Sequence, residues 1–345
     1  MVVHTDSATI ARARALVQRR IAGAIPGAQV AVWLDGRSIW SEGFGEADLE
    51  QAVAVTPLTR FRIGSISKSL TSALLGLLVE EGRLDLDAEV QRYVPAFPRK
   101  PWPVTTRQTA GHLAGFRHYR GDEFAISRHY ASVTEGLSIF ADDSLLFEPG
   151  TDYRYSSYGW NLISAVVEGA GGQPFLQQMQ ARVFEPLGMT RTSPDLLDTL
   201  LDRRGRYYDH HAATGPYTNS PAVDNSYKWA GGGFLSTADD LCRFASALLR
   251  PGFLSPETVR LLWTSQRTRA GRVTGYGMGW FVGPDSTGRA TAEHGGGSIG
   301  GTAILMIYPE SKLVVAVLTN LTGALSVRTL GSNVARTFFG DAGLR

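Results

Sequence analysis

The 345-residue sequence has little cysteine, little lysine and no long apolar run. Its single cysteine, Cys242, cannot form a disulfide within the chain and leaves no cysteine cluster that could bind zinc. The formal net charge of +2 is too small to favour nucleic acid or an anionic membrane as a partner. No segment reaches the roughly 18 apolar residues of a membrane-spanning helix, so we expect no membrane span.

The N-terminal segment lacks the uninterrupted apolar stretch of a signal peptide. It reads MVVHTDSATIARARALVQRR, in which charged residues recur throughout. The chain as given is therefore expected to be cytoplasmic. If a leader has been removed from it, a periplasmic or secreted protein is expected instead.

Strand-like segments lie near both ends of the chain. AQVAVWL and RSIWSEGFG flank Asp35-Gly36, which is a strong signal for a two-residue hairpin. TAILMIYP and LVVAVLTN, near the C-terminus, are apolar and β-branched, as strands with a buried face require. Helices are expected at 8–23 and 324–339; the first has apolar residues at helical spacing, namely Ile10, Ala13, Leu16, Val17 and Ile21.

The segment between these ends is expected to be mostly helical and rich in loops. The chain is therefore predicted to have an α/β (α+β) fold: an antiparallel sheet built from the N- and C-terminal segments, flanked by helices, with an inserted, mostly helical lobe. We assign the sheet domain to residues 1–70 plus 201–345 and the lobe to residues 71–200. A cleft between two such parts is a favourable place for a binding site.

One of the four lysines stands at the expected start of an apolar helix. In the stretch RIGSISKSLTSALLGLLVEEGRLDLD, Lys68 follows Ser65 by three residues. If the helix begins at Ser65, the two side chains share one face, with Cβ atoms about 5–6 Å apart. The free N–H groups and the dipole at a helix N-terminus also favour a developing negative charge.

This pair has a chemical and a purely structural interpretation. A serine hydroxyl becomes a good nucleophile only when a neighbour removes its proton. Burial lowers the pKa of a lysine, so a buried Lys68 could be neutral and take the proton of Ser65. Alternatively, Ser65 or Ser67 caps the helix and Lys68 is a solvated residue of its first turn. That alternative places a positive charge at the unfavourable end of the helix dipole.

Two further motifs accompany the serine–lysine pair. Tyr155-Ser156-Ser157 precedes another expected helix, and His294-Gly295-Gly296 precedes an expected strand. The order S-x-x-K, Y-x-S, H-x-G resembles that of the serine β-lactamase and penicillin-binding-protein superfamily. The resemblance extends from about residue 25 to residue 320. Within this superfamily the chain resembles the LACTB branch, in segments such as PGTDYRYSSYGWNLISAVVEGAGGQPF, VFEPLGMTRT and VDNSYKWAGGGFLSTADDLCRFASALL.

The resemblance implies a β-lactamase/transpeptidase-like fold and a site for acyl transfer. By this analogy Ser65 is the catalytic nucleophile, and Lys68 and Tyr155 form the general-base pair, with their shares of the proton undecided. The backbone N–H groups of Ser65 and Gly297 would form the oxyanion hole, next to Gly296. In that family the third motif lies on the edge strand of the sheet and faces the serine. No metal or organic cofactor is implied.

Further residues are expected at the same site. By the same analogy, Ser157 would hydrogen-bond the substrate or Lys68, and His294 would orient Tyr155 or contact the substrate. Four more residues are candidates to line the cleft, although ordinary packing is an equally open interpretation for them: His118, Tyr119, Tyr227 and Trp229.

The motifs also depart from the family pattern. His294 stands where β-lactamases carry lysine, and Gly295 stands where they carry a hydroxyl residue that could bind a substrate carboxylate. Ser157 replaces the usual asparagine, and the segment from His112 to Gly115 reads H-L-A-G in place of H-T-S-G. These differences weaken the case for an enzyme that destroys antibiotics.

Three functional hypotheses follow. The first is a serine hydrolase that acts through a covalent acyl-enzyme on a small-molecule ester or a peptide bond. The second is a penicillin-binding protein or weak β-lactamase with a β-lactam-like substrate. The third is a filament-forming structural protein of LACTB type with residual peptidase activity, which would entail homo-oligomerisation.

Other motifs compete with this interpretation. Gly296 to Gly300 matches the G-x-S-x-G nucleophile elbow, which would make Ser298 the nucleophile, but that motif requires a helix after the turn, whereas a strand-like run follows here. His210-His211 beside Asp209 has no third metal ligand at suitable spacing, which favours a polar loop.

A glycine-rich segment, AGGGFLSTADDL, lacks the G-K-[S/T] of a phosphate-binding loop. Its Thr237 and Asp240 instead predict a capping box at the start of a helix.

Overall fold

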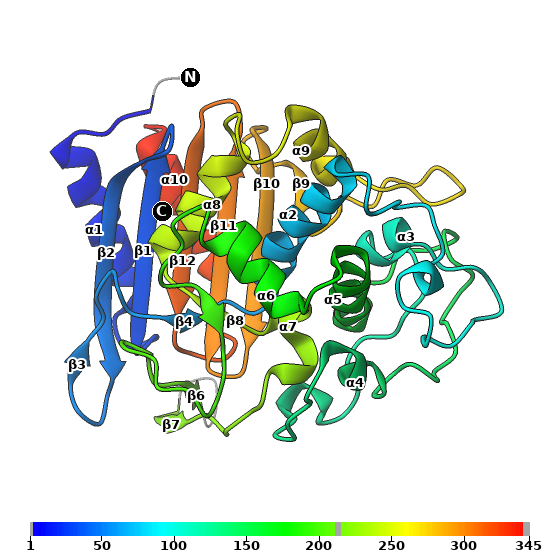
Figure 1. Ribbon diagram of the computed structural model, residues 1–345. Helices are drawn as coiled ribbons and strands as arrows, with labels where there is room; N and C mark the ends of the chain where they lie inside the picture. Colours follow the sequence, from blue (N-terminus) through cyan, green and yellow to red (C-terminus); the bar gives the residue numbers. More distant parts are fainter. Residues whose placement is uncertain (1–2, 211–214, 341–345) are drawn as a thin grey trace.

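A seven-stranded antiparallel sheet forms the centre of the molecule (Figure 1). The computed structural model describes residues 3–210 and 215–340. The sheet order is β3-β2-β1-β12-β11-β10-β9, so segments from the two ends of the chain lie side by side and the predicted fold class is confirmed. The strands are β1 (Gly27–Leu34), β2 (Arg37–Asp48), β3 (Val53–Ala54), β9 (Phe281–Pro284), β10 (Ala290–Ser298), β11 (Gly301–Tyr308) and β12 (Leu313–Thr319).

The hairpin between β1 and β2 turns at the predicted dipeptide. Asp35 (φ 46°) and Gly36 (φ 71°) both have positive φ, as a two-residue turn matched to the strand twist requires. The central pair, β1 with β12, runs in register from Ala28 opposite Thr319 to Leu34 opposite Leu313. Both strands are almost wholly buried, because helices cover both faces of the sheet.

Each face of the sheet has its own helical layer. α1 (Ser7–Ile21) and α10 (Val327–Phe338) pack on one face, and α8 (Ala238–Leu248) and α2 (Ile66–Glu80) on the other (Figure 1). In α1 four of the five predicted apolar positions are buried, and Thr9 is buried in place of Ile10. The Asp6 carboxylate accepts a hydrogen bond from the Thr9 N–H and so caps this helix.

The remaining helices lie mainly beside α2, around α5, which packs against α2, α3, α4 and α7. They are α3 (Thr106–Ala110), α4 (Val133–Leu137), α5 (Ser157–Gly171), α6 (Phe175–Met179), α7 (Trp229–Gly232) and α9 (Pro256–Trp263), with short turns η1 (Val90–Arg92), η2 (Glu123–Ala125), η3 (Gln180–Phe184) and η4 (Ser226–Lys228). Two small sheets complete the fold, β4 (Phe61–Arg62) with β8 (Phe234–Ser236) and β5 (Ser193–Pro194), and β6 (Tyr208–His210) with β7 (Tyr217–Asn219).

The division into a sheet domain and a lobe at residues 70 and 200 stays a prediction. α2 itself crosses the first of these boundaries, since it begins in the sheet segment and continues into the helical one. No helix among the described residues is long and apolar enough to cross a membrane.

The resemblance implied that the third motif lies on the edge strand of the sheet, and this is wrong. A short strand, β9, pairs with the first half of β10 and forms the edge of the sheet. This pairing ends at Glu293, so His294 to Gly297 follow immediately after it. A four-residue strand carries too little periodicity to be recognised in a sequence, which explains the error.

Candidate active site

Ser65 and Lys68 face each other at the start of α2. Ser65 precedes the first turn with helical backbone angles (φ −63°, ψ −7°), and its side chain makes no capping hydrogen bond. Lys68 Nζ lies 2.9 Å from Ser65 Oγ, and the Lys68 side chain is fully buried. The alternative interpretation, a capping serine with a solvated lysine, is therefore wrong for this pair.

The surroundings of Lys68 favour an uncharged amine. Burial, assisted by the positive charge of Lys228, holds the pKa of Lys68 well below its usual range. Lys68 Nζ also lies 2.6 Å from the Gly231 carbonyl oxygen and 3.1 Å from Ser157 Oγ. A neutral amine has two N–H donors and one lone pair.

These partners fix the direction of one hydrogen bond. The Gly231 carbonyl can only accept, so it takes one N–H of Lys68. If Ser157 accepts the second N–H, the lone pair of Lys68 is left to accept the Ser65 hydroxyl proton. This is the geometry that a general base requires.

Glycines let β10 run directly against the start of α2. Gly64 has φ 48°, and a Cβ there would lie 2.7 Å from the Gly297 nitrogen. A Cβ on Gly296 would lie 1.9 Å from the Ile63 carbonyl oxygen, which no side chain could tolerate. The backbone of Gly297 therefore reaches the cavity that Ser65 also lines, as an oxyanion hole of backbone N–H groups would require.

Tyr155 lies half-buried beside the serine–lysine pair. Lys68 Nζ lies 5.0 Å from the centre of its ring, and its phenol interacts with the hydroxyl of Ser65. Burial raises the pKa of Tyr155 above its usual value, while hydrogen bonds from Ser65 and Ser157 oppose the shift. The phenol therefore keeps its proton at neutral pH, whereas the lowered pKa of Lys68 favours an unprotonated amine that can accept one.

The start of α5 is held in place by two hydrogen bonds. Ser156 Oγ accepts the Gly159 N–H at 3.1 Å and caps the helix. The Ser157 N–H donates to His118 Nδ1 at 3.1 Å, so this ring nitrogen is an acceptor and the imidazole is neutral. Burial, with the charges of Lys68 and Arg154, lowers the pKa of His118 to about 4.

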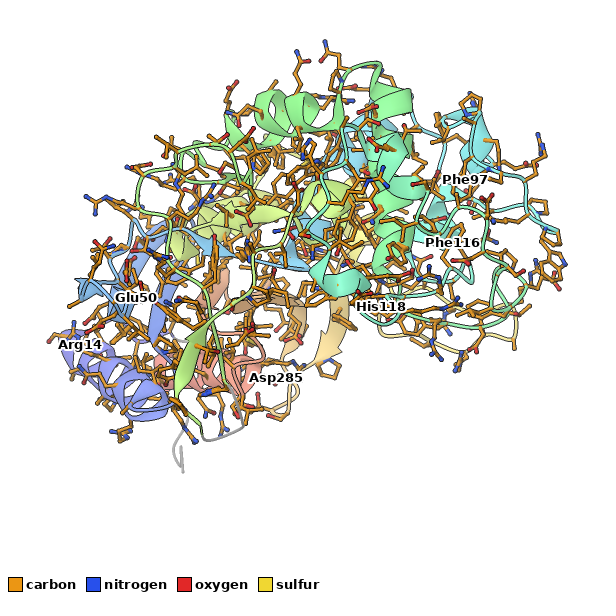
Figure 2. The ribbon with its side chains drawn as sticks, turned by 90° about the horizontal axis from the view of Figure 1, so that it is seen from below. Arg14, Glu50, Phe97, Phe116, His118 and Asp285 are labelled. Carbon is orange, nitrogen blue, oxygen red and sulfur yellow. The ribbon has the colours of Figure 1, made fainter. Side chains whose placement is uncertain are left out.

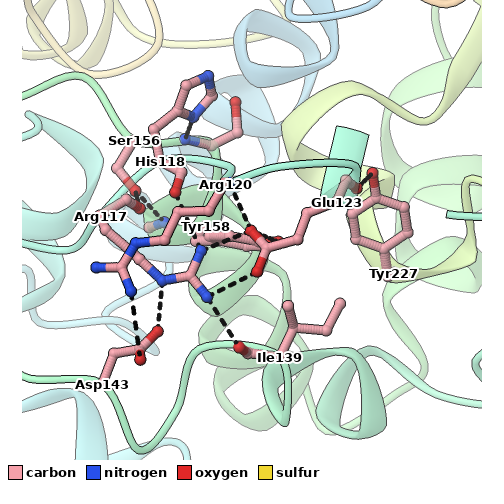
Figure 3. A network of polar contacts seen from close by, with 11 residues as sticks. Arg117, His118, Arg120, Glu123, Ile139, Asp143, Ser156, Tyr158 and Tyr227 are labelled. Atoms are coloured by element: carbon pink, nitrogen blue, oxygen red, sulfur yellow. Dashed lines mark hydrogen bonds and ion pairs between the residues drawn. The ribbon is translucent and has the colours of Figure 1, made fainter. Parts of the chain in front are cut away.

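Behind these groups, a partly buried ion-pair network around Arg117 fixes the loop that carries His118 (Figure 3). The Arg117 guanidinium donates twice to Glu123, at 2.6 and 2.9 Å, and once to Asp143 at 2.5 Å. The Arg117 carbonyl accepts from Ser156 Oγ at 2.6 Å, which ties the loop to α5. In the view of Figure 2, His118 lies between two regions of the molecule. One is the region of the large sheet, which carries Arg14, Glu50 and Asp285, and the other is the helical region, which carries Phe97 and Phe116.

His294 bonds a tyrosine that the sequence analysis missed. Its Nδ1 lies 2.6 Å from the Gly295 carbonyl, so Nδ1 carries the proton and Nε2 accepts the Tyr276 hydroxyl at 3.0 Å. Burial lowers the pKa of His294 to about 3, with a smaller contribution from Lys68 whenever that amine is protonated, so the imidazole is neutral. Its ring centre is 6.2 Å from that of Tyr155.

Five of the predicted site residues line a cavity of about 240 Å³, whereas Lys68, Tyr155, His294 and Gly296 are not among its lining residues. Tyr227 and Trp229 are buried and do not line it, whereas Lys228 between them does. Lys228 was not expected here, although the scarcity of lysine and the adjoining glycine run were available signals. The lining residues are Ser65, His118, Tyr119, Phe124, Ser157, Lys228, Gly231, Gly232 and Gly297.

The competing motifs do not form sites among the described residues. Ser298 ends β10 and β11 begins at Gly301, so the segment is a hairpin without the helix of a nucleophile elbow. His210 lies in β6, while His211 falls outside the described residues, and the described part of the chain holds no cluster of three or more metal-binding side chains.

The predicted capping box is half realised. Thr237 accepts from the Asp240 N–H and caps α8. The Asp240 carboxylate, however, accepts from the Arg191 N–H and the Thr192 hydroxyl.

Comparison with known proteins agrees with this geometry. The beta-lactamase family profile matches residues 13–335. The human mitochondrial serine beta-lactamase-like protein LACTB is 33% identical over a 379-residue alignment that covers 83% of this chain and 69% of that protein. The octameric penicillin-binding protein homologue from Pyrococcus abyssi superimposes with a TM-score of 0.84 at 24% identity, covering 96% of this chain and 78% of the other.

A second solved structure is similar over nearly the whole length of both chains. EstCE1, a hydrolase with promiscuous acyltransferase activity, superimposes with a TM-score of 0.81 at 24% identity, covering 96% of this chain and 98% of its own. At 24% identity, the two structural similarities establish the fold alone. The match to the family profile and the 33% identity to LACTB establish the family. The chain therefore belongs to the beta-lactamase family, in its LACTB-like branch.

Proposed function

We propose that this serine hydrolase cleaves an ester or amide bond through a covalent acyl-enzyme on Ser65. The observation that carries the proposal is the buried Lys68, whose Nζ lies 2.9 Å from Ser65 Oγ and whose pKa burial lowers. A buried lysine with a depressed pKa beside a hydroxyl that caps nothing is suited to proton abstraction. Membership of the beta-lactamase family supports the same reaction class.

In the first half of the reaction, Lys68 takes the Ser65 hydroxyl proton while Ser65 Oγ bonds to the carbonyl carbon of the substrate. The carbonyl oxygen becomes an oxyanion, which the N–H groups of Ser65 and Gly297 stabilise. Loss of one such donor typically costs about 10²–10³ in rate. The tetrahedral intermediate then expels the alcohol or amine, which receives the proton, and leaves an ester on Ser65.

In the second half, water replaces the leaving group. The amine of Lys68 accepts a proton from the water, whose oxygen attacks the acyl carbon, and the acid departs as Ser65 Oγ recovers its proton. Tyr155 acts in both halves as a protonated phenol that passes a proton between the leaving group and Lys68, because burial disfavours its phenolate. The pair titrates as a coupled unit.

His294 acts at a distance in this scheme. It is neutral and accepts the Tyr276 hydroxyl, and the Tyr276 ring stands edge-on to Tyr155 with centres 6.2 Å apart. His112 packs against both tyrosines, at 4.3 and 4.5 Å between ring centres. The two histidines therefore position Tyr155 through packing and through Tyr276.

The substrate class follows from the second and third motifs. Gly295 offers no hydroxyl to a β-lactam carboxylate, and Ser157 is shorter than the usual asparagine. We expect hydrolysis of a short 4-nitrophenyl ester to exceed that of a cephalosporin by at least about tenfold in kcat/KM, or about 1.4 kcal/mol. Cephalosporin turnover near the diffusional limit would instead establish a β-lactamase.

Covalent labelling tests the nucleophile directly. The protein is incubated with a fluorophosphonate and, separately, with a fluorescent penicillin, and the modified peptide is identified by mass spectrometry. We expect the fluorophosphonate on Ser65, with slower or incomplete labelling by the penicillin. A fluorophosphonate found on Ser298, or on no serine, would refute the proposed function.

Self-assembly is a separate proposal, supported by the octameric state of the Pyrococcus abyssi homologue. Light scattering coupled to size exclusion, at several protein concentrations, measures the mass of the particle in solution. A mass that is a multiple of the chain mass is expected, and a monomer at every concentration would rule out both the oligomer and the filament.

A further inference from the structure

Lys228 is a second buried lysine in the cavity, and the proposed reaction does not use it. Its side chain lies at the end of η4 and is 2% exposed. Among the described residues its Nζ makes one hydrogen bond, to the Phe124 carbonyl at 3.3 Å, and no ion pair. An ammonium group has three N–H donors, so the cavity contains a cationic side chain with unfilled hydrogen-bonding capacity.

The walls around this lysine provide aromatic faces. Nζ lies 4.6 Å from the ring centre of Phe124, 5.0 Å from that of Tyr227 and 5.9 Å from that of Tyr119. Aromatic faces attract a cation but accept no conventional hydrogen bond from it. The Tyr227 hydroxyl donates to the Glu123 carbonyl, so it points to another partner.

The nearby charged groups leave the lysine without a counter-ion. Its charged neighbours are Arg62, Asp195 and Lys68. Asp195 is paired with other groups: its Oδ2 accepts from Arg62 at 2.7 Å and from Asn225 at 2.8 Å, while its Oδ1 makes no hydrogen bond and lies 3.9 Å from the Arg204 guanidinium. Burial and the charge of Arg62 lower the pKa of Lys228 to about 7, while Asp195 opposes that shift. Lys228 is therefore partly protonated at neutral pH, and an anion bound beside it would complete the protonation.

No carboxylate lines the cavity among the described residues. Its lining includes His118, which is neutral, and the hydroxyl groups of Ser65, Ser157 and Tyr119. Lys228 is thus the charged member of a small chamber that also contains the proposed nucleophile. A buried cation without a paired carboxylate is costly, and a substrate anion is the group that can offset this cost.

We propose that Lys228 binds a carboxylate on the acyl donor, so that the preferred substrates are small esters or amides whose acyl part ends in a carboxylate. This inference rests on the proposed function of Ser65. According to this inference, Lys228 in η4 binds the substrate anion. The third motif of this chain has Gly295 and so lacks the hydroxyl residue that could do so. The cavity of about 240 Å³ has room for a short acyl group of this kind.

A competing role would be purely electrostatic. The charge of Lys228 lowers the pKa of Lys68, so its removal would affect the general base whatever the substrate. The two roles differ in one measurable quantity. Tuning of Lys68 changes the rates for charged and neutral acyl donors by the same factor, whereas carboxylate binding changes their ratio.

The experiment uses two pairs of 4-nitrophenyl esters that differ in one end group. The half-esters of glutaric and adipic acid carry a carboxylate where the valerate and hexanoate esters carry a methyl group. The ratio of kcat/KM, anionic over neutral, is measured at pH 6.5 with the uncatalysed rate subtracted. The proteins are the parent, Lys228→Met, Lys228→Arg and, as a surface control, Lys312→Met, whose lysine is exposed and pairs with Asp35.

We expect the parent to prefer at least one half-ester by tenfold or more. This ratio should fall by at least tenfold in Lys228→Met, recover in part in Lys228→Arg and stay at the parent value in Lys312→Met. The parent preference should also decrease as the pH rises through about 7, because Lys228 then loses its charge. An unchanged ratio in Lys228→Met, with both rates reduced equally, would overturn the inference.

A second measurement uses the parent protein alone and so does not depend on whether a variant folds. Glutarate and adipate should inhibit hydrolysis of the valerate ester by the parent competitively, and more strongly at pH 6.5 than at pH 8.5, while the uncharged diamides should not. Absence of inhibition, together with no preference for a half-ester, would refute carboxylate binding. Valerate hydrolysis that depends on Ser65 would leave the proposed function standing in that case, whereas failure of all four esters would point to the proposed function itself.

Discussion

The helices α2 and α5 both follow a serine, yet the two serines differ in what they bond. Ser156 has an extended backbone (φ −140°, ψ 117°), and its Oγ accepts the Gly159 N–H. Ser65 has helical angles, makes no capping hydrogen bond and has its Oγ beside Lys68 Nζ. Both helices are 15 residues long and both serines stand at the same helix position.

The backbone angles explain the difference. An extended residue before a helix directs its side-chain oxygen to the free N–H groups of the first turn, which stabilises the helix. A residue already in the helical conformation does not, so the hydroxyl of Ser65 remains free for the amine. One serine thus contributes to stability and the other is available for chemistry, a distinction that residue type alone would not reveal.

The largest expected effect is that of Ser65→Ala. Ester hydrolysis should fall by at least about 10³-fold, because no nucleophile remains. The free energy of unfolding should stay within about 0.5 kcal/mol, because the hydroxyl caps nothing. Valerate ester turnover and urea unfolding measure the two quantities. Turnover that survives in Ser65→Ala and disappears in Ser298→Ala would transfer the nucleophile to the other serine.

Lys68→Arg should reduce the rate by about 10²–10³-fold, because guanidinium keeps its proton at any working pH. In the parent, kcat/KM should rise with pH, since only the deprotonated amine of Lys68 can act. Burial lowers the pKa of Lys68, so this rise should occur well below the titration range of a free lysine. A pH series of both proteins measures the effect. Rates for Lys68→Arg within a few-fold of the parent would show that only a positive charge is needed.

Ser156→Ala should have the opposite profile. The Gly159 N–H and the buried Arg117 carbonyl each lose a partner, so the free energy of unfolding should fall by about 1–2 kcal/mol. Turnover per folded molecule should change by only a few-fold. Ser132→Ala, at the exposed cap of α4, is the matched control and should cost less. If Ser156→Ala were as stable as the parent, the contrast between the two helix starts would not hold.

Local spacing predicted part of this site and could not predict the rest. Ser65 and Lys68 share one helical turn, so their meeting follows from geometry. Lys228 is 160 positions from Lys68 in the printed numbering, and only the packing of α7 against α2 brings its segment to the same cavity. In the tight turn from η4 into α7, consecutive side chains point in different directions. Lys228 therefore lines the cavity while its neighbours Tyr227 and Trp229 do not.

The fold shows the same limit. The long strands β1, β11 and β12 have enough apolar, β-branched residues to be recognised from the sequence, and all three lie where they were expected. The short strands, such as β9, form because a longer neighbour offers hydrogen-bonding groups, which no local pattern reports. Tyr276 was missed for a related reason, since its hydrogen bond to His294 joins the segment before β9 to the middle of β10, 18 positions further along the chain.

The burial of Lys228 makes folding of this chain a proton-releasing reaction. In the unfolded chain its amine should titrate near the usual lysine pKa of about 10.4, whereas in the folded protein the pKa is about 7. Between these two values the unfolded state binds more protons, so the free energy of unfolding rises with pH, by up to roughly 1.4 kcal/mol per pH unit from this residue. The contribution is lost as the pH falls towards 7. Urea midpoints at pH 7.5 and 9 should show it, and Lys228→Met should reduce the difference, while Lys68, whose pKa burial also lowers, keeps its own contribution. A chamber that holds an unpaired lysine ready for a substrate anion thus makes the native state more resistant to mild alkali than to mild acid.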